Sequence, residues 1–181
     1  MRTAALKITL LSALASCTAF AQNSDFAVLY SAKILVGNQL LPSGKTDSAI
    51  SIATGYQLNY ARQILDARAG GLYLEFPLLE GGNGNGNSDI FFTPGVRFRL
   101  STQSRVSPYA ALGVGVFSSG GTPFSGRTTS AAVDFGAGFD VRFTRLLSLR
   151  TELRDYVSGS RIGGFQGRNR PAFCVGIAFH F

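Results

Sequence analysis

Residue types that carry out acid–base, nucleophilic or metal chemistry are few in this chain and poorly placed for it. Among 181 residues there is one histidine, His180, and there are two cysteines. A single histidine argues against zinc sites and against catalytic triads that use this residue. Asp134 and Asp140 are six residues apart, which is roughly 20 Å along an extended strand and too far for a working carboxylate pair. We therefore predict no catalytic residue, no metal site and no cofactor.

His180 and Cys174 each have a simple structural interpretation. His180 stands next to the last residue of the sequence, where we expect it at the rim of the fold, in contact with water, rather than as a catalytic base. Cys174 lies among glycine and alanine positions and is expected to fill space as a small buried residue.

Charged residues form the more informative set, because they occupy alternate positions in segments whose other positions are apolar. The set is Glu75, Arg97, Arg99, Asp134, Asp140, Arg142, Arg150, Glu152 and Arg154, with Lys33 as a less regular member. If a three-residue turn follows Phe143, Asp140 lies opposite Arg150, and an interior of low dielectric makes their pairing nearly obligatory. If these charges line an enclosed interior, they form either a charge-paired plug that fills it or a selectivity ring for a small anion.

The elements that must position these charges are β-strands, because apolar residues recur with period two along most of the chain. The expected strands cover residues 26–36, 50–60, 72–78, 90–100, 109–116, 131–143, 147–153 and 172–181. One face of each strand carries Phe, Leu, Ile and Val, whereas the other carries Gly, Ala and Ser with the charges. The fold class is therefore all-β.

The apolar face is expected to contact lipid. The chain is 45% hydrophobic and 15% charged, with 22 Gly and 15 Phe, and its mean hydropathy is +0.17. Beyond the N-terminus no stretch approaches the roughly 18 apolar residues of a spanning helix. A face of Gly, Ala and Ser would cover a soluble protein poorly, but it suits a narrow lumen. We predict an eight-stranded antiparallel up-and-down transmembrane β-barrel; a soluble sandwich or lipocalin-like barrel is the alternative.

Connection lengths are consistent with this architecture. The expected outer connections are residues 37–48, 80–88, 118–130 and 158–170, and the inner ones are residues 63–68, 101–105 and 144–146. Long and short connections alternate, which is typical of outer-membrane barrels with long external loops and short periplasmic turns. Both termini are then periplasmic.

The last strand ends in a pattern that resembles a known signal. Phe173, Val175, Ile177, Phe179 and Phe181 occupy alternate positions up to the last residue. This pattern resembles the insertion signal of Gram-negative outer-membrane barrels, which implies the barrel-assembly machinery as a partner during insertion. The segment 90–98, followed by residues 107–110, is similar to members of the same class.

The whole mature chain resembles small eight-stranded outer-membrane β-barrel proteins. They are the OmpA- and OmpX-like barrels of the outer membrane protein beta-barrel domain family. The resemblance implies a cell outer membrane location, with outer-membrane lipid as surroundings. OmpA-like proteins carry a peptidoglycan-binding domain after the barrel, and we expect none here because the sequence ends at Phe181.

The N-terminal segment has the three parts of a signal peptide. Arg2 and Lys7 are its basic residues, residues 8–14 are apolar, and Ala19 to Ala21 form a small-x-small cleavage site. We expect residues 1–21 to be the signal peptide and residues 22–181 the barrel. In the alternative interpretation, Cys17 at the end of a lipobox-like segment is lipidated instead.

A surface role is the function that these patterns favour. Basic residues of the outer connections either bind lipopolysaccharide phosphates or form an ordinary solvated surface; they are Lys45, Arg127, Arg161, Arg168 and Arg170, beside the acidic Asp47 and Glu80. We expect no nucleic acid as a partner, because the basic residues are split between lumen and loops and have no aromatic platform. We expect a non-enzymatic structural or surface-interaction protein with a side-chain-filled lumen. The alternative is a narrow passive, porin-like channel for small solutes or anions.

Overall fold

The regular structure of the described residues is entirely β-strand. The computed structural model describes residues 24–40, 46–67, 70–82, 88–100, 104–120, 128–159 and 169–181, with backbone alone for residues 36–40 and 46–49. The strands are β1 (Ser24–Leu40), β2 (Thr46–Ala67), β3 (Gly70–Gly82), β4 (Ser88–Phe92), β5 (Gly95–Leu100), β6 (Val106–Ser119), β7 (Thr128–Arg142), β8 (Leu147–Ser158) and β9 (Asn169–His180).

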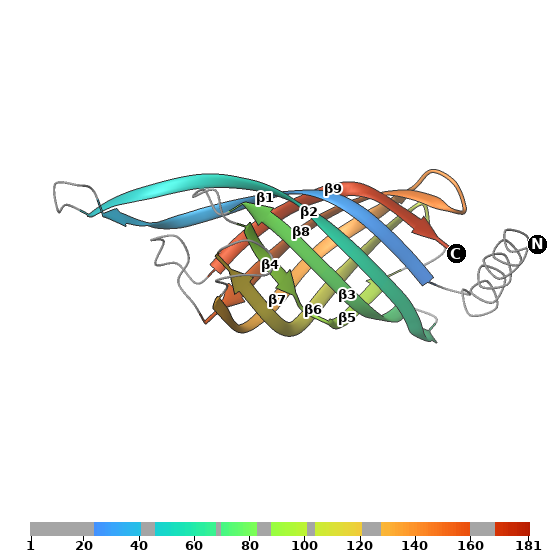
Figure 1. The fold of residues 1–181 in the computed structure, drawn as a ribbon. Helices are drawn as coiled ribbons and strands as arrows, with labels where there is room; N and C mark the ends of the chain where they lie inside the picture. The colour runs from blue at the N-terminus through green and yellow to red at the C-terminus, as the bar shows by residue number, and fades with distance from the viewer. Residues whose placement is uncertain are drawn as a thin grey trace, which may run out of the picture.

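These strands form a closed ring of antiparallel neighbours (Figure 1). Consecutive strands pair along the chain, except that β4 and β5 each pair with β3 and β6, and β9 closes the ring by pairing with β1. The last closing bonds join Ser24 and Phe181: each backbone N–H donates to the carbonyl oxygen of the other, at 2.8 and 2.9 Å. The predicted antiparallel up-and-down barrel is thereby confirmed.

The predicted strand 90–100 is divided, because a proline interrupts its hydrogen-bond ladder. β4 and β5 both lie between β3 and β6, so together they make one crossing of the barrel wall and the described strands make eight. Thr93 and Pro94 separate them, and Pro77 lies opposite on β3, where its carbonyl oxygen accepts from the N–H of Thr93 at 3.4 Å. Proline has no N–H to donate, so the regular ladder cannot continue through this point.

β1 and β2 are longer than the sequence pattern indicates and project beyond the rest of the wall (Figure 1). β1 pairs with β9 over residues 25–33 only, and β2 pairs with β3 over residues 55–67 only. Residues 34–40 pair only with residues 46–52, and residues 53–54 pair only with β1. We call residues 34–40 and 46–54 the ribbon. The end of the barrel from which it projects is the ribbon end, and the end with Ser24 and Phe181 is the terminal end.

Several predicted connections were therefore too long. Residues 37–40 and 46–48 belong to the ribbon, and residues 63–67 continue β2. Strand pairing also continues into the predicted connections 80–88, 118–130 and 158–170 at both of their ends. The predicted connections contain Gly and Ser, which are typical of turns. In the structure these residues form cross-strand hydrogen bonds and therefore belong to the strands.

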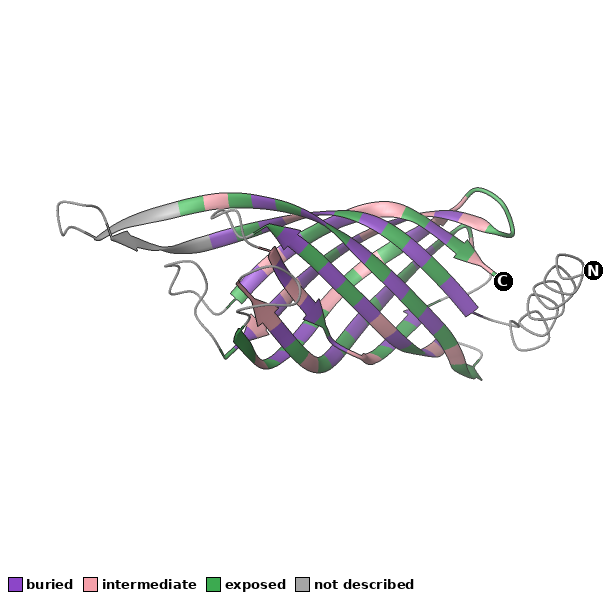
Figure 2. Ribbon diagram, in the orientation of Figure 1, coloured by how far each residue is buried: buried purple, intermediate pink, exposed green. Residues whose placement is uncertain are grey.

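The two faces of the wall differ as expected for a barrel in lipid. Figure 2 shows buried residues alternating with exposed or intermediate ones along the described strands. Large apolar side chains point outward, among them Phe135, Val114 and Ile177, which are 50%, 65% and 39% exposed. The described residues include no helix long and apolar enough to cross a membrane.

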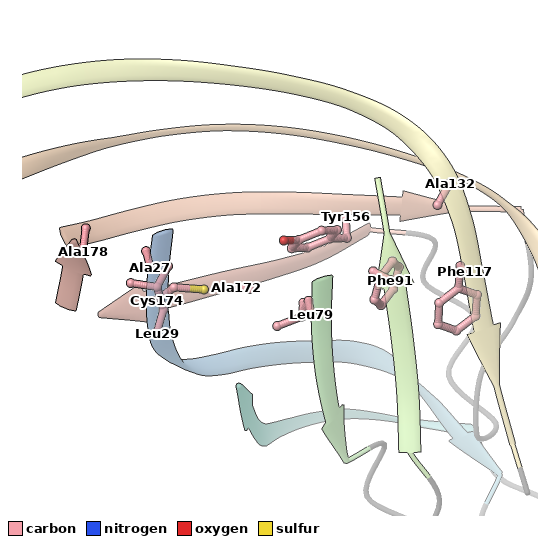
Figure 3. Packing of buried hydrophobic residues seen from close by; sticks show 10 residues of the cluster. All are labelled: Ala27, Leu29, Leu79, Phe91, Phe117, Ala132, Tyr156, Ala172, Cys174 and Ala178. Carbon is pink, nitrogen blue, oxygen red and sulfur yellow. The ribbon is translucent and has the colours of Figure 1, made fainter. Parts of the chain in front are cut away.

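Aromatic packing inside the ring lies toward the ribbon end. The rings of Phe91 and Phe117 lie 4.4 Å apart, and Phe91 lies 4.9 Å from the ring of Tyr156. Ala27, Ala172 and Cys174 line the inside of β1 and β9 (Figure 3). These small side chains leave space across the ring for long side chains from the opposite strands.

Candidate functional site

Toward the terminal end, three arginines converge on two aspartates. We call Asp25, Arg97, Arg99, Asp140 and Arg150 the proximal cluster. Register places Asp140 directly opposite Arg150, and Arg150 donates to its carboxylate from Nε at 2.7 Å and from Nη2 at 2.9 Å. Nη2 of Arg99 donates at 2.6 Å to Oδ2 of Asp140, the oxygen that also accepts from Nη2 of Arg150. Such bidentate, charge-assisted bonds are the strong kind.

Asp25 joins all three arginines. Its carboxylate accepts bonds from Arg97 at 2.5 Å, from Arg99 at 2.8 Å and from Arg150 at 3.2 Å. Asp25 is not among the inward charges predicted from the sequence, because the expected strand begins one residue later. Its position in the alternation, two before the inward-facing Ala27, is the signal that would have identified it.

Two tyrosine rings form cation–π contacts with the guanidinium groups of this cluster. Arg97 and Arg99 lie 5.2 and 4.9 Å from the centroid of the Tyr73 ring. Arg97 and Arg150 lie 5.2 and 5.5 Å from that of Tyr109. These are cation–π distances, and both tyrosines are buried. The tyrosines therefore restrict where the three arginines can move.

A second group, the central cluster, has the opposite balance of charge. It consists of Glu75, Asp134, Glu152 and Arg154. Arg154 donates to Glu152 at 2.8 Å, to Asp134 at 2.7 Å and to Glu75 at 3.0 Å. Neutral donors bind the same carboxylate oxygens, since Gln57 and Tyr109 donate to Glu152 at 2.9 and 2.8 Å, and Asn59 donates to Glu75.

Toward the ribbon end lies a looser set of charges. Lys33 is buried with its Nζ 3.7 Å from Asp89. Arg170, which was expected in an outer loop, is instead buried on β9. Its side chain donates to Ser158 and lies 4.8 Å from the centroid of the Phe117 ring. The prediction for Arg170 was wrong because β9 begins earlier than expected, so that this residue shares the inward face of Ala172.

The buried charges of the described residues balance in number. Six are basic and six are acidic: Lys33, Arg97, Arg99, Arg150, Arg154 and Arg170, with Asp25, Glu75, Asp89, Asp134, Asp140 and Glu152. Of the charged set predicted from the sequence, Arg142 differs from the others, because it is half-buried at the end of β7. Asp134 and Asp140 belong to different clusters and do not form a carboxylate pair.

The remaining predicted residues lie on or near β9. Phe173, Ile177, Phe179 and Phe181 face outward and are 39–50% exposed, and Val175 is half-buried among them. Cys174 is buried and donates to Gln57 at 3.3 Å. His180 is half-buried, with its Nε2 2.7 Å from the hydroxyl oxygen of Ser148. The Ser148 side chain is fully buried.

Most of the predicted basic loop residues cannot be placed. Lys45, Arg127, Arg161 and Arg168 lie outside the described residues, as do residues 1–21 with Cys17. Asp47 is described by its backbone only, and Glu80 is exposed on β3.

Comparisons with known proteins show which solved structures share this fold. A scan against protein-family models finds no match, and no curated protein matches the sequence. Solved structures do match. The attachment invasion locus protein Ail of Yersinia pestis is 13% identical, with 88% of this chain and 99% of that chain covered at a TM-score of 0.56. Neisserial surface protein A is 10% identical, with 87% and 97% covered at a TM-score of 0.58.

A third match is the N-terminal β-barrel domain of OprF from Pseudomonas aeruginosa. It is 14% identical, with 88% of this chain and 98% of that domain covered at a TM-score of 0.55. At these identities the likeness concerns the fold. Together with the closed ring and its apolar exterior, it identifies the chain as a small eight-stranded transmembrane β-barrel of the outer-membrane type.

Proposed function

We propose that this chain is a non-enzymatic surface-interaction protein of the outer membrane, and that its ribbon makes the interaction. The observation that carries the proposal is the extension of β1 and β2 past every neighbouring strand. Its outer face carries Ile50 and Ile52, which are 75% and 69% exposed. Within the described chain both ribbon edges lack a third strand, and such edges are templates for pairing with another chain.

The orientation follows from the expected topology, with the terminal end toward the periplasm and the ribbon outside the cell. Two of the matched proteins are named for attachment and for the surface, Ail and Neisserial surface protein A. We extend a surface role of this kind to the present chain as part of the proposal. Outer-membrane lipid is the surrounding partner, and the barrel-assembly machinery is proposed to insert the chain through the pattern that ends at Phe181.

The interior supports a side-chain-filled lumen rather than a channel. Equal numbers of buried acidic and basic side chains fill the barrel interior. The aromatic side chains of Phe91, Phe117 and Tyr156 pack against one another toward the ribbon end. An ion entering this interior would have to displace charged groups that already have partners. Eight strands enclose a space that side chains nearly fill.

The Ser148–His180 hydrogen bond supports a structural role better than a catalytic one. A serine nucleophile must reach its substrate, whereas the Ser148 side chain is fully buried. We interpret the pair as a link between β8 and β9.

The ribbon is tested by changing its exposed face without changing its backbone. Ile50→Thr with Ile52→Thr keeps β-branched residues in the ribbon but removes apolar surface. Cells that display this variant should adhere less to polystyrene and aggregate less than cells displaying the parent. Val114→Thr is the matched control, because Val114 is 65% exposed but lies within the wall. Equal loss in both variants, or no loss in the ribbon variant, would contradict the proposed role.

The lumen is tested by single-channel recording in planar bilayers. We expect no steady ion current from the parent protein. A steady current whose anion selectivity weakens in Arg150→Gln would contradict the filled lumen. It would show that the protein is a narrow channel.

A further inference from the structure

A cavity opens at the terminal end of the barrel, and neither the filled lumen nor the surface role accounts for it. Its volume is about 480 Å³, which is within the range of small-molecule sites. Tyr73 and Arg99 form part of its lining from inside the ring, and the turn that joins β7 to β8 contributes Arg145. The cavity thus reaches from the solvent to the proximal cluster.

Basic side chains outnumber acidic side chains in the lining of this cavity. Arg99, Arg142 and Arg145 line it together with Asp25 and Asp66. The carboxylate of Asp25 is shared by Arg97, Arg99 and Arg150 inside the ring. A concave site lined by more basic than acidic side chains attracts anions.

The cavity also offers a guanidinium group that the described residues do not use. Arg145 is exposed at the mouth, and the described part of the chain gives its side chain no hydrogen bond or ion pair. An anion bound in the cavity would accept charge-assisted hydrogen bonds from this group.

We propose that this cavity binds a small free anion that carries a phosphate or carboxylate group. Guanidinium groups are the side chains best suited to both groups. The ligand is a solute rather than a lipid headgroup, because Tyr73 and Arg99 face the interior of the ring and lipid contacts the opposite face. That the solute comes from the periplasm rests on the orientation proposed above; binding itself does not.

His180 provides a specific probe of the site. It lines the cavity and is the only histidine in the sequence, so a protein without a histidine tag gives one set of imidazole signals by NMR. We would titrate the folded barrel in neutral micelles at constant pH with inorganic phosphate and, separately, with succinate. At least one should shift the His180 signal saturably, whereas sodium chloride at equal ionic strength should not.

Two variants distinguish a built site from general attraction of charge. Arg145→Gln removes an arginine of the lining and should weaken binding about fivefold to tenfold, as expected for one charge-assisted contact. Arg105→Gln is the matched control, since Arg105 is exposed in the neighbouring turn but does not line the cavity. It should bind like the parent.

Three outcomes would overturn the proposal. They are the absence of saturable binding for both anions, equal weakening by the two variants, and a His180 shift produced by short-chain phosphatidic acid in the micelle but by neither free anion. None of these depends on the ribbon or on bilayer currents, so failure here is distinguishable from failure of the proposed surface function.

Discussion

Asp140 shows how much of the interior depends on single residues. Its carboxylate accepts hydrogen bonds from Arg99 and Arg150, and both arginines also reach Asp25. Each acid in the proximal cluster therefore neutralises more than one base. Replacing a shared partner leaves buried positive charge behind, which costs more than the bonds that are lost.

We expect Asp140→Ala to lower the free energy of unfolding by about 3 kcal/mol, because it leaves two buried guanidinium groups with Asp25 alone. Asp140→Asn combined with Arg150→Gln should recover part of this loss, since fewer charges remain unpaired. Urea unfolding in micelles of the parent, the single variants and the double variant measures the coupling. Strictly additive effects would argue against a coupled network.

Period-two alternation predicted the inward-facing residues wherever the strand itself was recognised. Arg97, Arg150 and Arg154 were placed by that pattern, and the structure buries all three. Asp25 and Arg170 were missed because each lies just outside an expected strand. Which acid contacts which base across the ring could not be predicted, because such contacts join strands that are distant in sequence, as Asp25 and Arg150 are.

The strands themselves were predictable in number and face, but not in length. A strand end is set by whether a neighbour continues to offer hydrogen bonds, and local sequence does not report this. The ribbon is the clearest case, since residues 37–40 carry Gly and Asn yet pair fully with residues 46–49. The break at Pro94 was visible in the sequence, but the alternation on either side of it concealed its effect.

Adjacent residues of β9 test the assignment of faces. Ile177 is 39% exposed on the outer face, whereas Ala178 is buried. Ile177→Arg should lower the stability of the folded barrel in lipid by about 2–4 kcal/mol if the residue lies near the bilayer midplane. Ala178→Ser should change it little, because Ser148 lies opposite and can share a hydrogen bond with the new hydroxyl. Reversible unfolding in lipid vesicles measures both; a larger loss for Ala178→Ser would reverse the faces.

At the scale of the molecule, closure of the ring depends on its first and last described residues. Ser24 and Phe181 exchange two backbone hydrogen bonds, and the Phe181 side chain remains 49% exposed outside. The closure and the proposed insertion signal therefore coincide in one residue but use different parts of it.

Removing Phe181 should reduce the amount of heat-stable barrel in the outer membrane and leave chain that periplasmic protease digests. Phe181→Ala separates the contribution of the backbone from that of the side chain, because it retains both backbone hydrogen bonds and removes the phenyl group. We expect Phe181→Ala also to assemble poorly, as measured by heat-modifiable gel mobility. Normal assembly of the alanine variant would show that the phenyl group of Phe181 is not part of the insertion signal.

The β1–β9 pairing also has a consequence for folding kinetics. The strand at the start of the described chain finds its second neighbour only when the final strand arrives, so the ring has a high contact order and a large loop-closure entropy. Until then β1 and β8 each present a free edge to any passing chain. The slow step of folding should be the closing of this seam, and the interval before it is when the protein is most exposed to aggregation.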